Sequence, residues 1–424
     1  MLIQSSKKYL RLYLSALFLL LLSTIAFNLI IDPFGVYNFV DIQSINNVKT
    51  GQGNHVRMGK AGAVRSFKPR AIVLGNSRAE YGINPEHPGW KVKPVYNLGV
   101  SGSNIYESLR YFQHAHSIQP LDKVLIMLDL NLFDAYWENA VDFSEERLAV
   151  SLNEQKNEYY YLSDFIPTTL SLNALTQSIN TIWRSATNKT TTYLSNGQRD
   201  WRNDLLFRTV IRNFGSYQNI FTIEEKSLLE AKAKGYPSDL KKYSYNQRTK
   251  INVFDWFRKI VKISIRDNID LHLALTPSHA RYFEMHRLMG NWTLWEEWKR
   301  ALVDIVEEEA KIAGVTPFPF WDFSGFTPLT TEYVPAENEK DTKMEWYFES
   351  SHFTTDLGDL IQDKVFNRNI LSNNVPDYFG VLITSKNIDE HLEETRVLNL
   401  RFREEQPNVA KELQELASKY IMNE

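Results

Sequence analysis

The sequence predicts an α/β protein with a parallel sheet, fixed to a membrane by one N-terminal helix and interrupted by a mainly helical insertion. Two observations lead to this prediction. Short apolar runs alternate with helical stretches through much of the chain, and one uncharged run of twenty residues lies near the N-terminus. At 424 residues, the chain is long enough for one large domain with an insertion, or for two modest domains.

The uncharged run is Leu12–Ile31, which as a helix would be roughly 30 Å long, the thickness of a bilayer core. Lys7, Lys8 and Arg11 precede it, and Asp32 follows it. Because basic residues stay on the cytoplasmic side, we expect a cytoplasmic N-terminus and a main domain that is periplasmic or otherwise extracytoplasmic.

A cleaved signal peptide is the alternative to an anchor. Thr24 and Ala26 could occupy the small-residue positions before a cleavage site. The apolar run nevertheless continues past them to Ile31. We therefore expect a single-pass inner (cytoplasmic) membrane protein, with residues 1–34 as its cytoplasmic tip and transmembrane anchor.

Four short apolar runs predict buried strands of the parallel type. They are Ala71–Leu74, Pro94–Leu98, Lys123–Leu128 and Asp270–Leu275. Helical patterns follow at Ile105–Ser117, Val253–Arg266 and Thr293–Ile312. Strands that alternate with helices indicate right-handed βαβ units and a doubly wound sheet.

The pattern changes between about residues 142 and 250, where Tyr, Asn, Thr and Lys dominate and the clear buried strands stop. Helical stretches such as Glu224–Lys234 fit this segment, so we expect an insertion or cap. The last segment, residues 376–424, is charged with a helical pattern and predicts a C-terminal extension.

Composition excludes several classes of function. The net charge of -3, without a basic run beyond the first dozen residues, argues against nucleic acid as a partner. The absence of cysteine excludes thiolate zinc sites, disulfides and cysteine nucleophiles. Aromatic residues reach 13%, which fits either core packing or a surface that covers sugar faces.

The histidines do not predict a metal site. His114 and His116 are two residues apart, a spacing that points to opposite sides of a helix. His279 and His286 are seven apart and have no obvious carboxylate partner. Neither pair matches a familiar ligand spacing, and we expect no metal and no cofactor.

Ser77 directly follows the first predicted strand, at a strand-to-helix junction that would expose its hydroxyl. It is a candidate nucleophile, although serine at such a place can simply cap the helix. Arg78 could bind an anionic substrate such as a uronic acid, or could pair with a neighbouring acid.

Two further segments follow predicted strands and could donate hydrogen bonds to an oxyanion. The small residues after the second strand would let backbone N–H groups approach an anionic oxygen closely. Gly102 and Gly99 are the two candidates for this donor. Asn131 follows the third strand and carries a side-chain amide. Both segments could equally be ordinary turns between a strand and a helix, without any role in binding.

A late segment adds an acid and a base. Glu349 precedes His352 by three residues, a spacing that can place both on one side of a turn so that the carboxylate orients the imidazole.

The order of these segments resembles the SGNH (GDSL-like) hydrolase superfamily, in which four blocks supply Ser, Gly, Asn and His. The resemblance implies Ser77 as nucleophile, His352 as base, Gly102 and Asn131 as oxyanion donors, and Glu349 as the acid. That family normally has Asp at the acid position and Gly-x-Asn-Asp in the third block, and this chain departs from both patterns.

The resemblance covers about residues 70–135 and 270–370. It implies a flavodoxin-like three-layer fold for a catalytic domain of residues 60–375, with the insertion at about 142–250. Asp322, within Trp321–Gly325, is a spare acid.

The resemblance is greatest to the membrane-anchored, periplasmic branch that includes the alginate O-acetylation proteins. It implies a serine esterase or O-acyltransferase that acts on acetyl esters of a cell-surface polysaccharide. Since acetyl-CoA is absent outside the cytoplasm, a transferase would need a membrane-bound acyl donor protein. The alternatives are an inactive, glycan-binding component of a polysaccharide assembly complex, and a lipid esterase.

Overall fold

The computed structural model describes residues 2–187, 189, 192–200, 203–233, 237–367, 376 and 378–421. The chain forms two compact units. The anchor unit comprises residues 1–68, 113–120 and 141–195, and the sheet unit comprises residues 69–112, 121–140 and 196–424. The interval from 142 to 250 is thus divided between them near residue 195.

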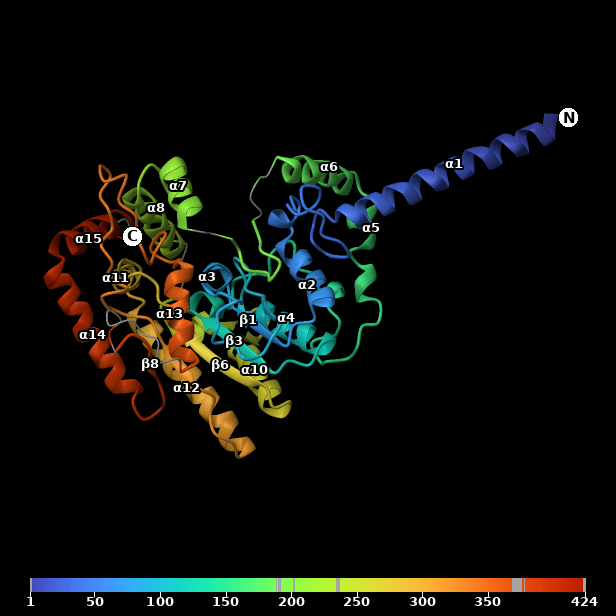
Figure 1. Ribbon diagram of the computed structural model, residues 1–424. Coiled ribbons are helices and arrows are strands. Elements are labelled where there is room, and N and C mark those ends of the chain that lie inside the picture. The colour runs from blue at the N-terminus through green and yellow to red at the C-terminus, as the bar shows by residue number, and fades with distance from the viewer. Residues whose placement is uncertain are drawn as a thin grey trace. The chain divides into compact units, whose positions relative to one another are not determined.

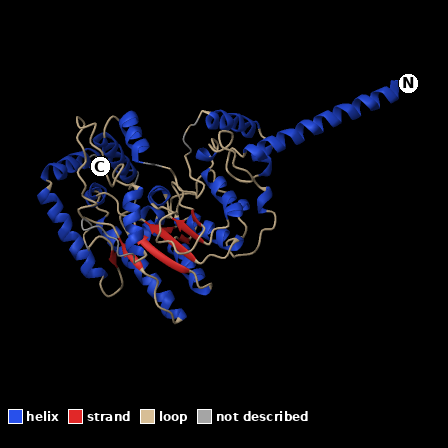
Figure 2. Ribbon diagram, in the orientation of Figure 1, coloured by secondary structure: helices blue, strands red, loops and turns tan. Residues whose placement is uncertain are grey.

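A six-stranded sheet forms the centre of the sheet unit (Figure 2). Its strands are β1 (Ala71–Leu74), β2 (Val95–Asn97), β3 (Lys123–Leu128), β6 (Asp270–Leu275), β7 (Phe320–Asp322) and β8 (Val381–Leu382). Their order is β2-β1-β3-β6-β7-β8, and every neighbouring pair is parallel except β7 and β8. The predicted α/β class is confirmed, with one correction: the antiparallel β8 makes the sheet mixed.

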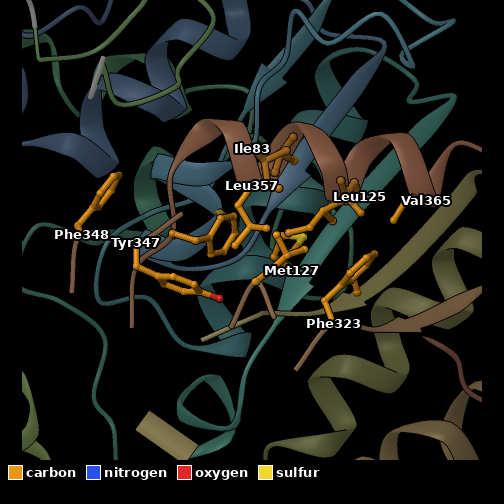
Figure 3. Packing of buried hydrophobic residues seen from close by; sticks show 14 of the residues in the cluster. Ile83, Leu125, Met127, Phe323, Tyr347, Phe348, Leu357 and Val365 are labelled. Atoms are coloured by element: carbon orange, nitrogen blue, oxygen red, sulfur yellow. The ribbon is translucent and has the colours of Figure 1, made fainter. Parts of the chain in front are cut away.

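The central strands are apolar throughout because both faces of the sheet are covered. All of β1 is buried, as are the last five residues of β3. In Figure 3, Leu125 and Met127 of β3 lie close to Leu357 and Val365 of helix α13 (Thr355–Val365), within one apolar cluster. Parallel strands place their carboxyl ends along one edge, where ligands bind in sheets of this kind.

Helices surround the sheet and build a second, smaller core. Those of the sheet unit are α3 (Ser77–Gly82), α7 (Asn203–Phe214), α8 (Tyr217–Ala233), α9 (Leu240–Ser244), α10 (Phe254–Arg266), α11 (Ala280–Leu288), α12 (Trp292–Ala313), α13, α14 (Ile388–Glu405) and α15 (Pro407–Ile421), with α4 (Ile105–Ile118) divided between the units. A short hairpin joins β4 (Tyr245–Asn246) to β5 (Ile251–Asn252). Leu229, Met285 and Leu413 hold α8, α11 and α15 together.

The anchor unit contains α1 (Leu2–Ile31), α2 (Val56–Phe67), α5 (Phe165–Thr169) and α6 (Leu172–Ala186). Within α1, Ser6–Ile31 is long and apolar enough to cross a membrane, with a mean hydropathy of 2.4 and only 11% of its most apolar stretch buried. Its last turns contact α5 and α6, and its N-terminal part extends away from the rest of the unit (Figure 1).

Candidate functional site

Ser77 lies at a sharp turn between β1 and α3, at the carboxyl edge of the sheet. Gly75 makes this turn with φ of +134°, and a β-carbon there would lie 2.6 Å from the carbonyl oxygen of Met127. Only glycine fits such a position without strain. Asn76 caps the helix by accepting a hydrogen bond from the Arg78 N–H, so Ser77 is not the cap.

The hydroxyl of Ser77 meets the imidazole of His352. The distance from Ser77 Oγ to His352 Nε2 is 2.6 Å, although the two residues are 275 positions apart in the sequence. When the imidazole carries its proton on Nδ1, the hydroxyl donates to Nε2, which is the arrangement a general base requires.

Glu349 holds the other side of the imidazole. Its Oε1 contacts His352 Nδ1 directly, and its two oxygens accept the backbone N–H groups of His352 and Ser351, each at 2.8 Å. Burial acts to raise the pKa of Glu349, but the charge and hydrogen bond of His352 and the two backbone N–H groups hold it below its ordinary value. The acid is therefore a carboxylate that fixes the imidazole.

Two glycines let the helix that carries Ser77 approach the helix that follows His352. Gly82 ends α3, which begins at Ser77, and Gly358 lies in α13, which begins three residues after His352. A β-carbon on Gly358 would lie 1.8 Å from the carbonyl oxygen of Gly82. The ring of Tyr81 also packs edge-on against His352, with 5.1 Å between ring centroids.

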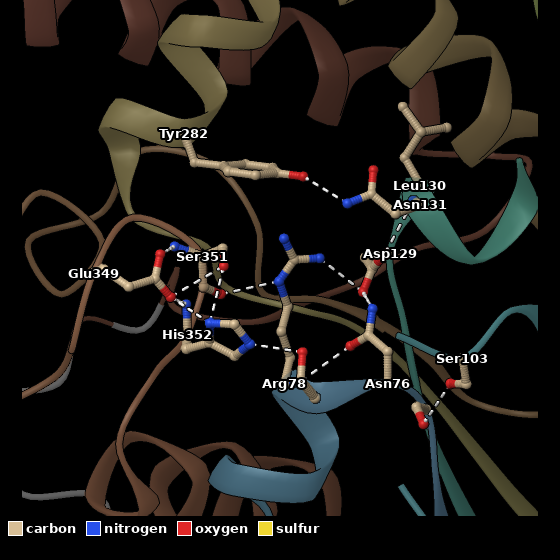
Figure 4. Close-up of polar contacts among 12 residues, drawn as sticks. Asn76, Arg78, Ser103, Asp129, Leu130, Asn131, Tyr282, Glu349, Ser351 and His352 are labelled. Carbon is tan, nitrogen blue, oxygen red and sulfur yellow. Dashed lines mark hydrogen bonds and ion pairs between the residues drawn. The ribbon is translucent and has the colours of Figure 1, made fainter. Parts of the chain in front are cut away.

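Arg78 is buried behind Ser77 and joins three segments of the site (Figure 4). Its guanidinium pairs with Asp129 at 2.7 Å, donates from Nε to the carbonyl oxygen of Ser351 at 2.9 Å, and lies over the ring of Tyr282. Burial acts to lower the pKa of Arg78, but Asp129 raises it above its ordinary value. Of the two sequence interpretations, pairing with an acid matches this geometry.

The two predicted oxyanion donors lie differently. The Asn131 amide donates to the hydroxyl of Tyr282 at 3.2 Å, and in Figure 4 the guanidinium of Arg78 lies between Asn131 and His352. Gly102 has φ of +66° and faces open space. Its competitor Gly99 already donates its N–H to Asn97 and is tightly packed. The geometry thus brings Ser77, His352 and Glu349 together, but not Asn131.

The spare acid, Asp322, belongs to another cluster. Its carboxylate pairs with Lys299 at 2.6 Å and His391 at 2.9 Å, and accepts the hydroxyl of Ser324 at 2.6 Å. Burial acts to raise the pKa of Asp322, but Lys299 and His391 hold it well below its ordinary range. Its side chain fastens β7 to α12 and α14.

A cavity of about 290 Å³ adjoins the site and reaches Arg78 and Ser351, the chain neighbours of Ser77 and His352. Its walls combine aliphatic, aromatic and polar side chains, among them Leu130, Leu228, Leu294, Trp137, Tyr282, Asn291 and Glu224. Burial, and then the Glu349 carboxylate, raise the pKa of Glu224. Sequence analysis did not identify Glu224, Asp129 or Tyr282, because no local motif distinguishes them.

Two of the other histidines, His114 and His279, have hydrogen-bond partners in the fold. His114 bonds to Ala61 and Ala149, and His279 bonds to the carbonyl oxygen of Glu332. Burial lowers the pKa of both His279 and His286 to about 3, so both are neutral near pH 7. Within the described ranges, no group of three His, Cys, Asp or Glu residues could hold a metal ion.

No protein-family model matches the chain, and no curated protein is found to be similar to it. The chemistry of the site therefore has to be inferred from its own geometry.

Proposed function

We propose that the protein is a membrane-anchored serine esterase or O-acyltransferase of the SGNH type. One observation carries the proposal: a serine, a histidine and a carboxylate are hydrogen-bonded in series at the carboxyl edge of the sheet. Ser77 Oγ lies 2.6 Å from His352 Nε2, and Glu349 contacts the opposite ring nitrogen. This is the arrangement that converts a weak hydroxyl into a nucleophile.

The sheet supports the same class. Counted along the chain, its five parallel strands have the order 2-1-3-4-5, which is the flavodoxin-like order. In such sheets the order reverses beside the first strand, and ligands bind at that edge. Ser77 follows β1 and Asp129 follows β3, the two strands that flank this switch point.

In the proposed reaction, Ser77 Oγ attacks the carbonyl carbon of an ester while its proton passes to His352 Nε2. Glu349 stabilises the imidazolium that forms. The tetrahedral intermediate then collapses, and His352 returns the proton to the departing alcohol, which leaves an acyl group on Ser77. Water releases the acyl group as an acid in an esterase, and a sugar hydroxyl accepts it in a transferase.

Gly102 is the better supported oxyanion donor. It lies in a left-handed turn with open space beside it, so a substrate oxygen can approach its backbone. The Asn131 amide donates one N–H to Tyr282, and in Figure 4 the guanidinium of Arg78 lies between this amide and His352. This assignment keeps one of the two donors that the family resemblance implies.

We further propose that the site works outside the cytoplasm on a polysaccharide. The basic residues near the N-terminus favour a cytoplasmic N-terminus, which would put the sheet unit and the part of the anchor unit that follows α1 on the other side. Trp137, Tyr282 and Glu224 give the cavity flat rings and a carboxyl group, which suit a sugar. A transferase would receive its acyl group from a membrane-bound donor protein.

A lipid esterase is the second candidate, and the aliphatic wall of the cavity favours it. Leu130, Leu228 and Leu294 could cover an acyl chain. A series of p-nitrophenyl esters from acetate to octanoate separates the candidates. The glycan hypothesis expects kcat/KM to be highest for acetate, whereas a maximum at longer chains would favour the lipid.

Hydrolysis of p-nitrophenyl acetate by the full-length protein in detergent tests the proposal. Wild type should release nitrophenol, and Ser77→Ala and His352→Ala should fall to background while circular dichroism shows them folded. Equal rates in all three proteins would remove the catalytic interpretation. An inactive, glycan-binding component would then be the leading hypothesis.

A further inference from the structure

Helix α6 has its apolar residues on the outside. Its buried face consists of the small side chains Ala174, Ser178, Thr181 and Ser185. Leu172, Ile179 and Trp183 are instead exposed, at 83%, 57% and 62%. A surface helix normally turns its apolar side toward the protein, so this arrangement is reversed.

The exposed surface of α6 is itself divided. With 3.6 residues per turn, Leu172, Ile179 and Trp183 fall on one flank of the helix. Asn173, Asn180 and Arg184 are also exposed but fall on the other flank. The helix therefore has three sides: one against its own unit, one apolar and one polar.

Polar contacts hold α5 and α6 against the last turns of α1. Asn28, which interrupts the apolar run of α1, donates to the carbonyl oxygen of Thr169 at 2.8 Å and accepts the hydroxyl of Ser178 at 2.7 Å. Ser185 accepts the backbone N–H of Val48, in the loop after α1. These bonds fix α6 at the level where α1 ends.

The loop that follows α1 exposes apolar residues at the same level. Phe39, Ile42 and Ile45 are all exposed, and Ile166 of α5 is 66% exposed. Asn46 ties this loop to the carbonyl oxygen of Ile30 near the end of α1. Apolar side chains from three segments thus surround the place where α1 meets the rest of the unit.

We propose that the apolar flank of α6, together with Ile166 and the loop 39–45, inserts into the bilayer interface beside α1. The lipid surface is the occupant that fits, because these exposed apolar residues lie on α5, on α6 and on the loop after α1, the elements that contact or directly follow the end of the apolar helix α1. An amphipathic helix that lies in the interface buries one flank among the acyl chains and keeps the other in water. Trp183 also has the residue type that favours this depth. The protein would thereby be held at the membrane in a fixed orientation.

The absence of cysteine allows a direct test. Single variants Leu172→Cys, Ile179→Cys and Trp183→Cys in the full-length chain are labelled with a nitroxide and placed in phosphatidylethanolamine–phosphatidylglycerol vesicles at a low protein-to-lipid ratio. Asn173→Cys and Asn180→Cys are matched controls on the polar flank. Leu20→Cys, within α1, reports separately whether the anchor is inserted.

The readout is the ratio of nitroxide accessibility to oxygen and to a water-soluble nickel chelate. We expect this ratio to be at least several-fold higher at the three apolar positions than at the two controls. Equal ratios on both flanks, with Leu20→Cys inserted, would overturn the proposal. So would protection of the apolar flank from both reagents, which would indicate a second copy of the chain on this surface. None of these outcomes depends on catalysis.

Discussion

The acid beside His352 is a glutamate, and the turn that carries both residues accommodates its longer side chain. Glu349 accepts two backbone N–H groups of that turn as well as the imidazole N–H. The carboxylate is therefore fixed before any substrate arrives.

Glu349→Gln tests this role. We expect kcat to fall by roughly 10²–10⁴-fold with little change in KM, because an amide neither fixes the required tautomer nor stabilises the imidazolium. Steady-state kinetics on p-nitrophenyl acetate measure both constants. Asp322→Asn is the matched control, since that carboxylate contacts Lys299 and His391 instead. A drop in activity per folded molecule in Asp322→Asn, but not in Glu349→Gln, would reassign the acid.

Arg78 offers a second test at this scale. Arg78→Met leaves Asp129 buried without its ionic partner, and we expect the free energy of unfolding to fall by about 3–5 kcal/mol. The double variant Arg78→Met, Asp129→Leu should recover much of that loss. Chemical denaturation measures each value. If the double variant is no more stable than Arg78→Met, the ion pair is not the main role of Arg78 in stability.

Sequence analysis found Ser77, His352 and Glu349 because each lies in a recognisable local context. It could not place Asn131, because the direction of that amide depends on Tyr282, 151 residues away in the sequence. Glu224 was missed for a similar reason. It lines the cavity from α8, and no predicted strand ends near it in the sequence to mark it as a site residue.

Among the helices and strands, the close approach of α3 and α13 determines the geometry of the site. Ser77 begins α3, and His352 lies just before α13, so the packing of the two helices sets the distance between the Ser77 hydroxyl and the His352 imidazole. The approach depends on Gly82 and Gly358, where the backbones nearly touch.

Gly358→Ala should separate the two helices. We expect a loss of stability of about 1–3 kcal/mol from overpacking, together with a lower kcat, since a displacement of 1 Å in a reacting pair can cost about 10²-fold in rate. Thermal unfolding and kinetics measure the two effects. Asp356→Ala, at an exposed position of the same helix, should leave kcat unchanged. Wild-type kcat in Gly358→Ala would show that the helix contact does not set the geometry.

The predicted strands 71–74, 123–128 and 270–275 match β1, β3 and β6, because those short runs are mostly apolar and stand out from the polar segments around them. β7 and β8 were not predicted as strands, since three and two residues are too few to show a period. The antiparallel direction of β8 could not be predicted either, because it depends on the path that the chain takes between β7 and β8 and not on the residues of the strand.

The division into two units could not be predicted from composition. Residues 141–195 pack with the N-terminal 68 residues, whereas residues 196–250 pack with the sheet. The whole interval has one polar, aromatic-rich composition, so no boundary is visible within it. The buried hydrogen bonds of Asn28 and Ser185 join distant segments within the anchor unit, and no local sequence pattern reveals them.

Stability of the whole molecule should depend on pH through Glu332. Burial raises the pKa of Glu332 from its ordinary value of 4.5 to about 7, although it accepts the N–H groups of Glu345 and Trp346. The folded state then binds a proton that the unfolded state has lost. The contribution of Glu332 to the free energy of unfolding should therefore fall as pH rises from 4.5 to 7 and stay lower above it, by on the order of 1–3 kcal/mol, while the lowered pKa values of His279 and His286 act in the opposite direction.

Glu332→Gln should remove this dependence, because the amide does not titrate. Urea unfolding at several pH values between 4.5 and 7.5 measures it. The difference between wild type and Glu332→Gln isolates the contribution of Glu332, and the same pH dependence in both proteins would contradict it.

Covalent labelling of Ser77 tests the central claim most directly. The full-length protein is treated with a fluorophosphonate, and the adduct is located by peptide mass spectrometry. A serine activated by His352 should give one adduct, on the peptide that contains Ser77. The adduct should be absent in Ser77→Ala and should form roughly 10²–10⁴-fold more slowly in His352→Ala. No adduct in the folded wild type, or equal labelling of Ser77→Ala, would contradict the assignment of Ser77 as a nucleophile.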